Sequence, residues 1–229
     1  HPGDSFSYDM FQQAAELVRR PKEINPLNTP KPRNAIATGQ SQSAHRLITF
    51  INAFGKSTDL FDGYFIHSRV GAVPELSGGA AAPLSELAHC QVMAPDVVRI
   101  REDLGRPVFN LQTETDLFPL HALASRQEDS THFRLWEVAG SAHADLYVSN
   151  IGLRDAGNDV TAAAVTTTPR SNPLLKKCRD NISTAPQHHF VAKAAIRALN
   201  NWIVDGIAPP SQPRLEINAT GDGLATDKH

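Results

Sequence analysis

The nine residues from Ile36 to Ala44 constrain most strongly what this chain can fold into. An apolar, strand-like run meets Gly39, and Ser41, the small residue Ser43 and an amphipathic segment follow. This is the order of a nucleophile elbow, a strained strand-to-helix turn that lifts one serine hydroxyl above a parallel sheet. The turn crowds the backbone two residues on either side of the serine, so both positions must be small. Gly39 meets that demand, and Ser43 stands where glycine is usual.

The flanking segments agree with this interpretation. Residues 34–38 are predicted to form a short buried strand, and Gly55 is a natural end for the helix that follows the turn. The helix has apolar residues at helical spacing on one face, namely Ala44, Leu47, Ile48, Ile51 and Phe54. The alternative is an ordinary turn serine that caps this helix. We expect Ser41 to be a nucleophile.

Further strand and helix patterns alternate along the chain. Strands are predicted at 62–68, 107–112 and 133–138, and helices at 5–20 and 189–204. Alternation of this kind predicts an α/β fold, with a mostly parallel sheet flanked by helices. We expect one domain over residues 1–229. Residues 71–106 and 147–187 have little periodicity, and we expect these two insertions to form a lid or cap.

Composition narrows the class of protein. The chain has 229 residues, 41% of them hydrophobic, and a formal net charge of −2. That supports a globular domain with a sizeable core and gives no electrostatic basis for binding nucleic acid. No apolar run approaches the roughly 20 residues that span a bilayer, so no transmembrane segment is expected.

The cysteines and possible glycosylation sites leave alternatives open. Cys90 and Cys178 lie in irregular segments, where they either pair or remain free thiols. No compact Cys/His cluster suggests zinc, so we expect no metal and no other cofactor. Asn181-Ile182-Ser183 and Asn218-Ala219-Thr220 match the N-glycosylation pattern, which favours a secreted or periplasmic protein but leaves the compartment unknown.

A serine nucleophile needs a base, and the base needs an acid that fixes its tautomer. In the fold implied here the order is serine, acid, histidine, each just beyond a strand. The strand at 107–112 is followed by Glu114 and Asp116. We favour Asp116, because a turn can swing its side chain toward the histidine, and keep Glu114 as the alternative acid. Either carboxylate could instead be a solvated loop residue or cap a helix beginning near Leu117.

Of the ten histidines, His143 alone directly follows the strand at 133–138. The small residues between that strand and His143 let a loop bring the ring close to Ser41, so we expect His143 to be the base. Core positions or positions behind the site are expected for His45 and His67, and a helix start for His188 and His189. A metal site that combines Asp145, His143 and another histidine is a weaker alternative, because no ligand spacing strongly supports it.

The tetrahedral intermediate of acyl transfer needs two N–H donors around its oxyanion. Gln42, which follows the nucleophile, supplies one through its backbone, and the second normally comes from a loop after an earlier strand. Only one helix precedes the elbow here. We therefore expect that these 229 residues are the C-terminal portion of the fold, and that part of the sheet lies upstream. An open sheet edge of this kind favours self-association.

The chain resembles the alpha/beta-hydrolase-domain family whose members carry a Gly-Gln-Ser-Gln-Ser elbow. The shared segments include 37–44, 113–116 and the Arg-Leu-Trp-Glu-Val-Ala-Gly run of 134–140 that leads into His143-Ala144-Asp145. This resemblance implies a serine hydrolase, with Ser41, Asp116 or Glu114, and His143 at the catalytic positions. It also implies a longer N-terminus, and it does not name the substrate.

Two functions follow from these residues. The first is cleavage of a carboxylic ester through an acyl-enzyme, with a small-molecule substrate whose apolar moiety the Leu-, Val-, Pro- and Ala-containing insertions would hold. The second is a non-catalytic or incomplete hydrolase-like module that binds a ligand or partner without turnover. Loss of one oxyanion donor costs on the order of 10²–10³ in rate, which would leave such a module nearly inactive.

Overall fold

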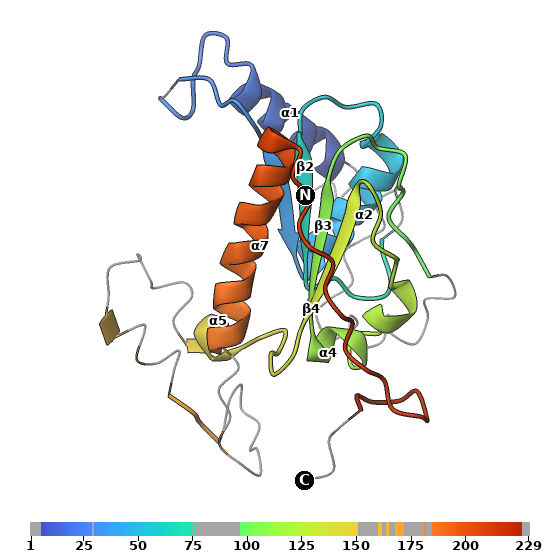
Figure 1. The fold of residues 1–229 in the computed structure, drawn as a ribbon. Coiled ribbons are helices and arrows are strands. Elements are labelled where there is room, and N and C mark those ends of the chain that lie inside the picture. The colour runs from blue at the N-terminus through green and yellow to red at the C-terminus, as the bar shows by residue number, and fades with distance from the viewer. Residues whose placement is uncertain are drawn as a thin grey trace.

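A four-stranded parallel sheet forms the centre of the molecule (Figure 1). The computed structural model describes residues 6–28, 30–74, 76, 97–150, 160–161, 164, 168–171, 181 and 185–225. The strands lie side by side in chain order, and all neighbours are parallel. They are β1 (Ile36–Gln40), β2 (Gly63–His67), β3 (Val108–Thr113) and β4 (Phe133–Val138).

Helices cover both faces of this sheet, so the predicted α/β architecture is confirmed. The two long helices beside the sheet are α2 (Gln42–Phe54) and α7 (Ala185–Asp205), and α1 (Ser7–Arg19) packs against α2. Short helices follow the strands at one end of the sheet, namely α4 (Glu114–Leu117), η1 (Ala122–Ser125) and α5 (Leu146–Asn150). In Figure 1 the start of α7 lies at the same end as α4 and α5.

Each face of the sheet has its own hydrophobic core. Phe50, Ile51 and Ile66 lie in the core between the sheet and the α1–α2 layer. On the opposite face Phe65, Phe109 and Leu111 pack against Leu199 and the rest of the buried side of α7. Successive side chains of β2 point to opposite faces of the sheet, so Phe65 and Ile66 belong to different cores, as expected for a strand buried on both sides.

The strand that precedes Ser41, β1, differs from its prediction in bounds and in burial. It begins at Ile36, two residues later than expected, and continues to Gln40. It is also an edge strand, and the side chains of Thr38 and Gln40 are exposed. Ala37 belongs to the core on the α1–α2 side, and Ile36 packs against the core on the α7 side. The short buried strand predicted at 34–38 is therefore shifted by two residues and is only partly buried.

Residues after α7 protect the opposite edge of the sheet. Arg134 Nε donates to Pro209 O at 2.7 Å, and Trp136 Nε1 donates to Pro210 O at 2.9 Å. The Arg214 guanidinium forms an ion pair with Asp129 and also donates to the carbonyl of Leu135 in β4. These side-chain bonds hold an irregular segment along β4 in place of another strand.

Most of the two predicted insertions lies outside the described residues, and so do Cys90 and Cys178. Residues 97–106, at the end of the first insertion, are described. There Ile100 and Leu104 are buried in the core on the α1–α2 side of the sheet. This last stretch of the segment 71–106 is therefore part of the domain body and does not belong to a lid.

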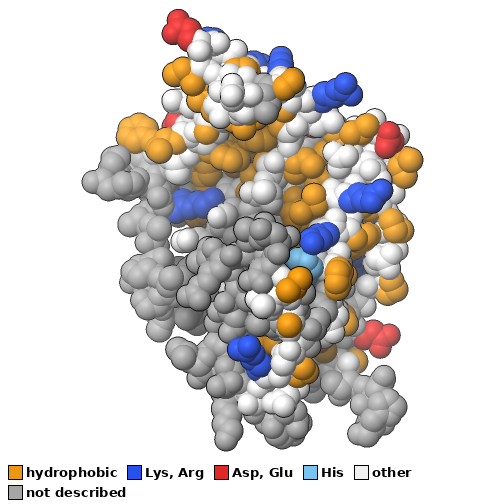
Figure 2. All heavy atoms as spheres, turned by 90° about the vertical axis from the view of Figure 1, so that its left-hand side faces the viewer, with side chains coloured by type: hydrophobic (Ala, Val, Ile, Leu, Met, Phe, Trp, Pro, Cys, Tyr) orange, Lys and Arg blue, Asp and Glu red, His pale blue; other side chains and the backbone are white. Residues whose placement is uncertain are grey.

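The surface carries no single dominant charge on the side turned to the viewer in Figure 2, where apolar, cationic and polar side chains alternate over the described part. Phe6 and Met10 at the start of α1 and Leu17 near its end are exposed. Within the described residues, no helix has the length and apolar character needed to span a membrane.

Candidate active site

Ser41 lies at the turn between β1 and α2, directly beyond the carboxyl end of its strand. Its backbone has φ 57° and ψ −119°, a conformation that side-chain-bearing residues rarely adopt. Its N–H donates to the carbonyl oxygen of His67 at 3.0 Å, so the end of the neighbouring strand holds the turn. The sequence Ile36–Phe54 thus has the strand, turn and helix that an exposed serine nucleophile requires.

The tightness of this turn explains why Gly39 is present. A Cβ added at Gly39 would lie 2.5 Å from the carbonyl oxygen of Ser43 and 2.8 Å from the nitrogen of Ala44. Contacts this close to backbone atoms cannot be relieved by rotating a side chain. The first turn of α2 therefore passes directly over Gly39, as the crowding argument from sequence predicts.

Three predicted residues from three loops meet at this end of the sheet. The Oγ atom of Ser41 lies 2.7 Å from Nε2 of His143, although 102 residues separate them in the chain. On the other side of the imidazole, Nδ1 of His143 lies 2.6 Å from Oδ1 of Asp116. Since an ionised carboxylate only accepts hydrogen bonds, Nδ1 carries the proton and Nε2 is left to accept one from Ser41.

Asp116 is fixed in place by the end of its own strand. Its Oδ2 atom accepts the backbone N–H of Thr113 at 2.6 Å, and the residue is fully buried. Thr113 and Asp116 form the capping box of α4, which begins at Glu114 rather than near Leu117. The same carboxylate therefore caps a helix and orients a histidine, two roles that sequence reasoning had treated as alternatives.

Glu114 does not contact His143. Its Oε1 atom instead accepts the N–H of Gly140 at 2.7 Å, at an exposed position in the turn after β4. Thr115 acts on the same loop, because its hydroxyl accepts the N–H of His143 at 2.7 Å. The segment Thr113–Asp116 therefore holds the imidazole through Asp116 and the loop of His143 through its two neighbours.

The loop of His143 is shaped by small residues. Gly140 has φ 66°, in the left-handed region, so it reverses the chain immediately after β4. Ser141 is buried and donates its hydroxyl to the carbonyl of Val138 at 2.6 Å. The side chain of His143 remains 22% exposed, which leaves the site open to a substrate.

Gln42, the predicted oxyanion donor, is the first residue of α2. Its N–H is one of the four that an α-helix leaves without an intrahelical acceptor, and the helix dipole favours negative charge at this end. The side chain of Gln42 lines a cavity of about 420 Å³ between α1 and α2, to which Tyr8 and Phe11 also contribute. The serine hydroxyl therefore stands next to a donor of the type that an oxyanion requires.

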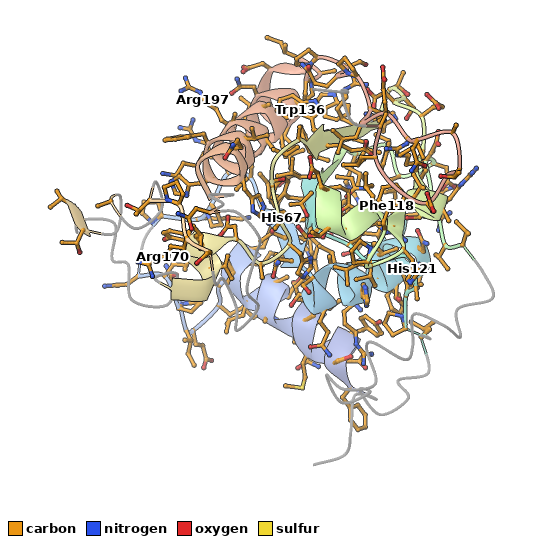
Figure 3. The ribbon with its side chains drawn as sticks, turned by 90° about the horizontal axis from the view of Figure 1, so that it is seen from below. His67, Phe118, His121, Trp136, Arg170 and Arg197 are labelled. Carbon is orange, nitrogen blue, oxygen red and sulfur yellow. The ribbon has the colours of Figure 1, made fainter. Side chains whose placement is uncertain are left out.

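A second group of polar side chains adjoins these residues and was not predicted as a unit. His67, at the end of β2, lies near the middle of the end view in Figure 3, below α7. Its Nε2 atom lies 2.5 Å from Nε2 of His188 in α7, and Nδ1 of His188 lies 3.0 Å from Oδ2 of Asp145. His188 is in phase with Ala195, Leu199 and Trp202 on the buried side of α7, a periodicity that could have shown it pointing toward the sheet.

Burial changes the titration of two histidines near the site. Burial, together with the neighbouring His188, lowers the pKa of His67 to about 4. Burial also lowers the pKa of His45 in α2 to about 4, with Arg69 and His143 acting in the same direction. Both rings are therefore neutral near pH 7. They add no charge beside His143 when it accepts a proton.

No metal centre is formed by the part of the chain that the structure describes, because it contains no suitable cluster of His, Cys, Asp and Glu side chains. Asp145, considered above as a ligand alongside His143, instead bonds to His188. Burial alone would raise the pKa of Asp145. The hydrogen bonds from His188 and from the backbone of Val148 outweigh burial, so the pKa lies below the ordinary value of 3.8.

Comparison with known proteins supports the same architecture. Residues 1–229 match a family model described as "Alpha/beta hydrolase domain". No curated protein and no solved structure gives a significant match to the chain.

Proposed function

The chain belongs to the alpha/beta hydrolase domain family, a generally hydrolytic family, and we propose that it is a serine hydrolase that cleaves carboxylic esters. The observation that carries this proposal is the continuous hydrogen-bonded series Ser41–His143–Asp116, with contacts of 2.7 and 2.6 Å. A nucleophile, a base and an orienting acid in this order are the groups that acyl transfer requires.

In the first half of the reaction, Ser41 Oγ attacks the ester carbonyl as its proton moves to Nε2 of His143. The imidazolium that forms is stabilised by the buried carboxylate of Asp116, which stays ionised. Negative charge develops on the former carbonyl oxygen, where the N–H of Gln42 donates. The C–O bond to the alcohol then breaks, and the alcohol leaves with the proton from His143.

In the second half, water takes the place of the alcohol. His143 removes one proton from the water as its oxygen attacks the acyl-enzyme, and the same proton returns to Ser41 Oγ when the C–O bond to serine breaks. The products are a carboxylic acid and the regenerated enzyme, so one ester and one water are consumed in each cycle. Every proton transfer passes through Nε2, the nitrogen that faces Ser41.

The two insertions are proposed to shape the substrate pocket. Residues 71–96, the part of the first insertion that precedes the buried stretch, and residues 147–187 contain Leu, Val, Pro and Ala side chains, which suits an ester with an apolar acyl or alcohol group. Residues 68–70 connect the end of β2 to the first insertion, and residues 144–146 connect His143 to the second. Both insertions therefore start from the end of the sheet that carries Ser41.

The proposal is tested by labelling and turnover together. A fluorophosphonate is expected to label the chain at Ser41, and a short-chain p-nitrophenyl ester is expected to be hydrolysed. Ser41→Ala should abolish both, and His143→Ala should slow labelling by several orders of magnitude. Ser43→Ala is the matched control, because Ser43 is an exposed serine only two residues from Ser41, at the start of α2.

Two outcomes would contradict the proposal. If His143→Ala labels as fast as the parent, His143 is not the base. If the parent and Ser41→Ala show equal, background-level labelling and turnover, the chain is a hydrolase-like module that binds without turnover.

A further inference from the structure

Asp145, His188 and His67 form a second histidine–aspartate series beside the proposed triad. The side chains of Asp145 and His188 are each 4% exposed, and their contact joins the loop after β4 to α7. The contact between the two imidazoles then joins α7 to the end of β2. The planes of the two rings make an angle of 68°, and their centroids are 4.7 Å apart. The rings therefore do not stack, and they contact each other through their nitrogen atoms.

This second series provides an additional, indirect connection between the proposed catalytic residues. At one end, the carbonyl of His67 accepts the N–H of Ser41. At the other end, Asp145 lies only two residues beyond His143 in the same loop. The nucleophile and the base are therefore joined twice, directly through their 2.7 Å contact and indirectly through the second series.

The protons can be assigned from the hydrogen-bonding capacities of the groups. The carboxylate of Asp145 only accepts, so Nδ1 of His188 must donate to it. Between the two facing Nε2 atoms one ring donates and the other accepts, and which ring donates depends on the tautomer. Burial lowers the pKa of His67 to about 4, so this ring is neutral near pH 7. In either arrangement the hydrogen bonds fix the orientation of both rings.

Packing alone does not account for three polar residues in this place. A buried carboxylate is costly unless it is paired and hydrogen-bonded, and apolar side chains of similar volume would fill the space as well. Hydrogen bonds add direction, which apolar contacts lack. Directional hydrogen bonds can hold two loops at a fixed distance from each other. That distance matters near a reacting centre, where a misplacement of about 1 Å can lower the rate on the order of 100-fold.

We propose that His67, His188 and Asp145 are positioning residues that set the distance between Ser41 and His143. They hold the turn of Ser41 through the backbone of His67 and the loop of His143 through Asp145. None of the three is proposed to exchange a proton with the substrate. This inference rests on the proposed serine hydrolase function, because it assigns a role relative to that nucleophile and base.

Three variants of the full chain cut the series at different points. In His67→Gln the link between β2 and α7 is weakened. In His188→Asn the amide nitrogen stands close to the former Nδ1, so the bond to Asp145 is kept and the one to His67 is lost. The third variant combines both changes. His189→Ala is the matched control, since His189 neighbours His188 on α7 but packs against the rings of Tyr147 and Phe190.

Fluorophosphonate labelling separates positioning from a purely structural role. Each single variant is expected to label to the same final stoichiometry as the parent, with a rate constant about 10- to 100-fold lower. The double variant should be slowed by about the same factor as each single variant. Either single change already breaks the series of hydrogen bonds that connects Ser41 to the loop of His143, so the second change removes nothing more. In ester hydrolysis kcat should fall while KM stays within about twofold.

Other results would overturn the inference. A lower labelled fraction with an unchanged rate constant per labelled site means that the residues only stabilise the fold. Multiplicative slowing in the double variant means that the two histidines act independently. An equal slowing in His189→Ala means that any change in this turn of α7 has the same effect.

A proton NMR measurement keeps this inference separable from the proposed function. The Nδ1–H proton of His143, bonded to Asp116, should give a downfield resonance that disappears in His143→Ala. If this resonance moves in His67→Gln and His188→Asn but not in His189→Ala, the series positions His143 even in a chain that fails to label. If it is unchanged in every variant, the positioning role is refuted even in a chain that labels.

Discussion

Thr113 donates its backbone N–H to Asp116 at 2.6 Å, so the end of β3 holds the carboxylate that faces His143. The second oxygen of Asp116 lies 2.6 Å from Nδ1 of His143. Both oxygens of a fully buried carboxylate are therefore engaged, one by the backbone and one by the imidazole. Such a group cannot rotate without losing a buried hydrogen bond, which makes it a rigid support for the histidine.

Asp116→Asn is expected to lower kcat by about 10⁴-fold while the fold is retained. The amide must donate through its nitrogen or accept through its oxygen, so it cannot accept from both Thr113 and His143. The imidazole would then lose its tautomer preference. The measurement is ester turnover, together with a thermal melt that shows the variant to be folded. A variant that keeps more than a tenth of the parent's activity would show that Asp116 is not the acid.

Glu114→Gln distinguishes the two candidate acids. Its side-chain oxygen can still accept the N–H of Gly140, the exposed contact that Glu114 makes in the structure. We expect turnover within about threefold of the parent, since Glu114 does not touch His143. A loss of activity comparable to that of Asp116→Asn would transfer the role of the acid to Glu114.

Much of the site could be predicted from local sequence. The sequence predicts that Ser41, Asp116 and His143 lie together, because each one follows a strand whose apolar pattern is clear and parallel strands end at one edge; the structure brings the three side chains into contact. The choice between Asp116 and Glu114 depended on the side-chain directions in one turn of α4. Those directions are set by the capping box with Thr113, which the pattern Thr-Glu-Thr-Asp allows but does not require.

The second histidine–aspartate series could not be predicted in the same way. His67 and His188 are 121 residues apart in the chain, and their contact depends on how α7 crosses the sheet. Sequence reasoning placed His188 at a helix start, whereas α7 already begins at Ala185. Helical phase could have placed His188 on the buried face, but no local signal names its partner across the sheet.

Ser41→Gly is expected to raise the free energy of unfolding relative to Ser41→Ala by about 1 kcal/mol. The reason is the φ of 57° at this position, which glycine adopts without the steric cost that a Cβ imposes. Urea denaturation of both inactive variants measures the difference. At Ala194, an exposed position in the interior of α7, replacing alanine by glycine should instead lower the stability because glycine weakens a helix interior. Equal stabilities at position 41 would mean that the turn is unstrained.

Gly39→Ala should be destabilising by about 2 kcal/mol or more, and it should also slow the labelling of Ser41. The added Cβ would meet the carbonyl of Ser43 at 2.5 Å, so either β1 or the start of α2 has to move. Gly223→Ala is the control, because its nearest neighbour is the end of the flexible Asn218 side chain. A Gly39→Ala protein as stable and reactive as the parent would contradict the tight turn.

Acidification is expected to destabilise the fold between about pH 6.5 and pH 4. His45 and His67 have pKa values lowered to about 4 by burial, against an ordinary value of 6.5. In that window the unfolded chain binds protons that the folded chain does not, so the contribution of these two histidines to the free energy of unfolding falls as the pH falls and levels off below pH 4. At about 1.4 kcal/mol per pKa unit, each histidine contributes on the order of 3 kcal/mol.

Urea denaturation at pH 7 and pH 4.5 checks this dependence. In His45→Gln the loss of stability between the two pH values should be smaller than in the parent, because one neutral buried imidazole has been removed. His67→Gln should act in the same direction, and the double variant should show the smallest loss. A parent stability that does not change between these pH values would mean that the two rings are more hydrated than their burial implies.

The positions of the strands in the chain also determine when the site can form during folding. Ser41 follows β1 and His143 follows β4, and the two strands between them must be in register before these side chains meet. Contacts that are this distant in sequence form slowly, because the loops between them must close first. A refolding chain should therefore regain helical circular dichroism before it regains fluorophosphonate reactivity. The delay between the two signals would time the closure of the parallel sheet.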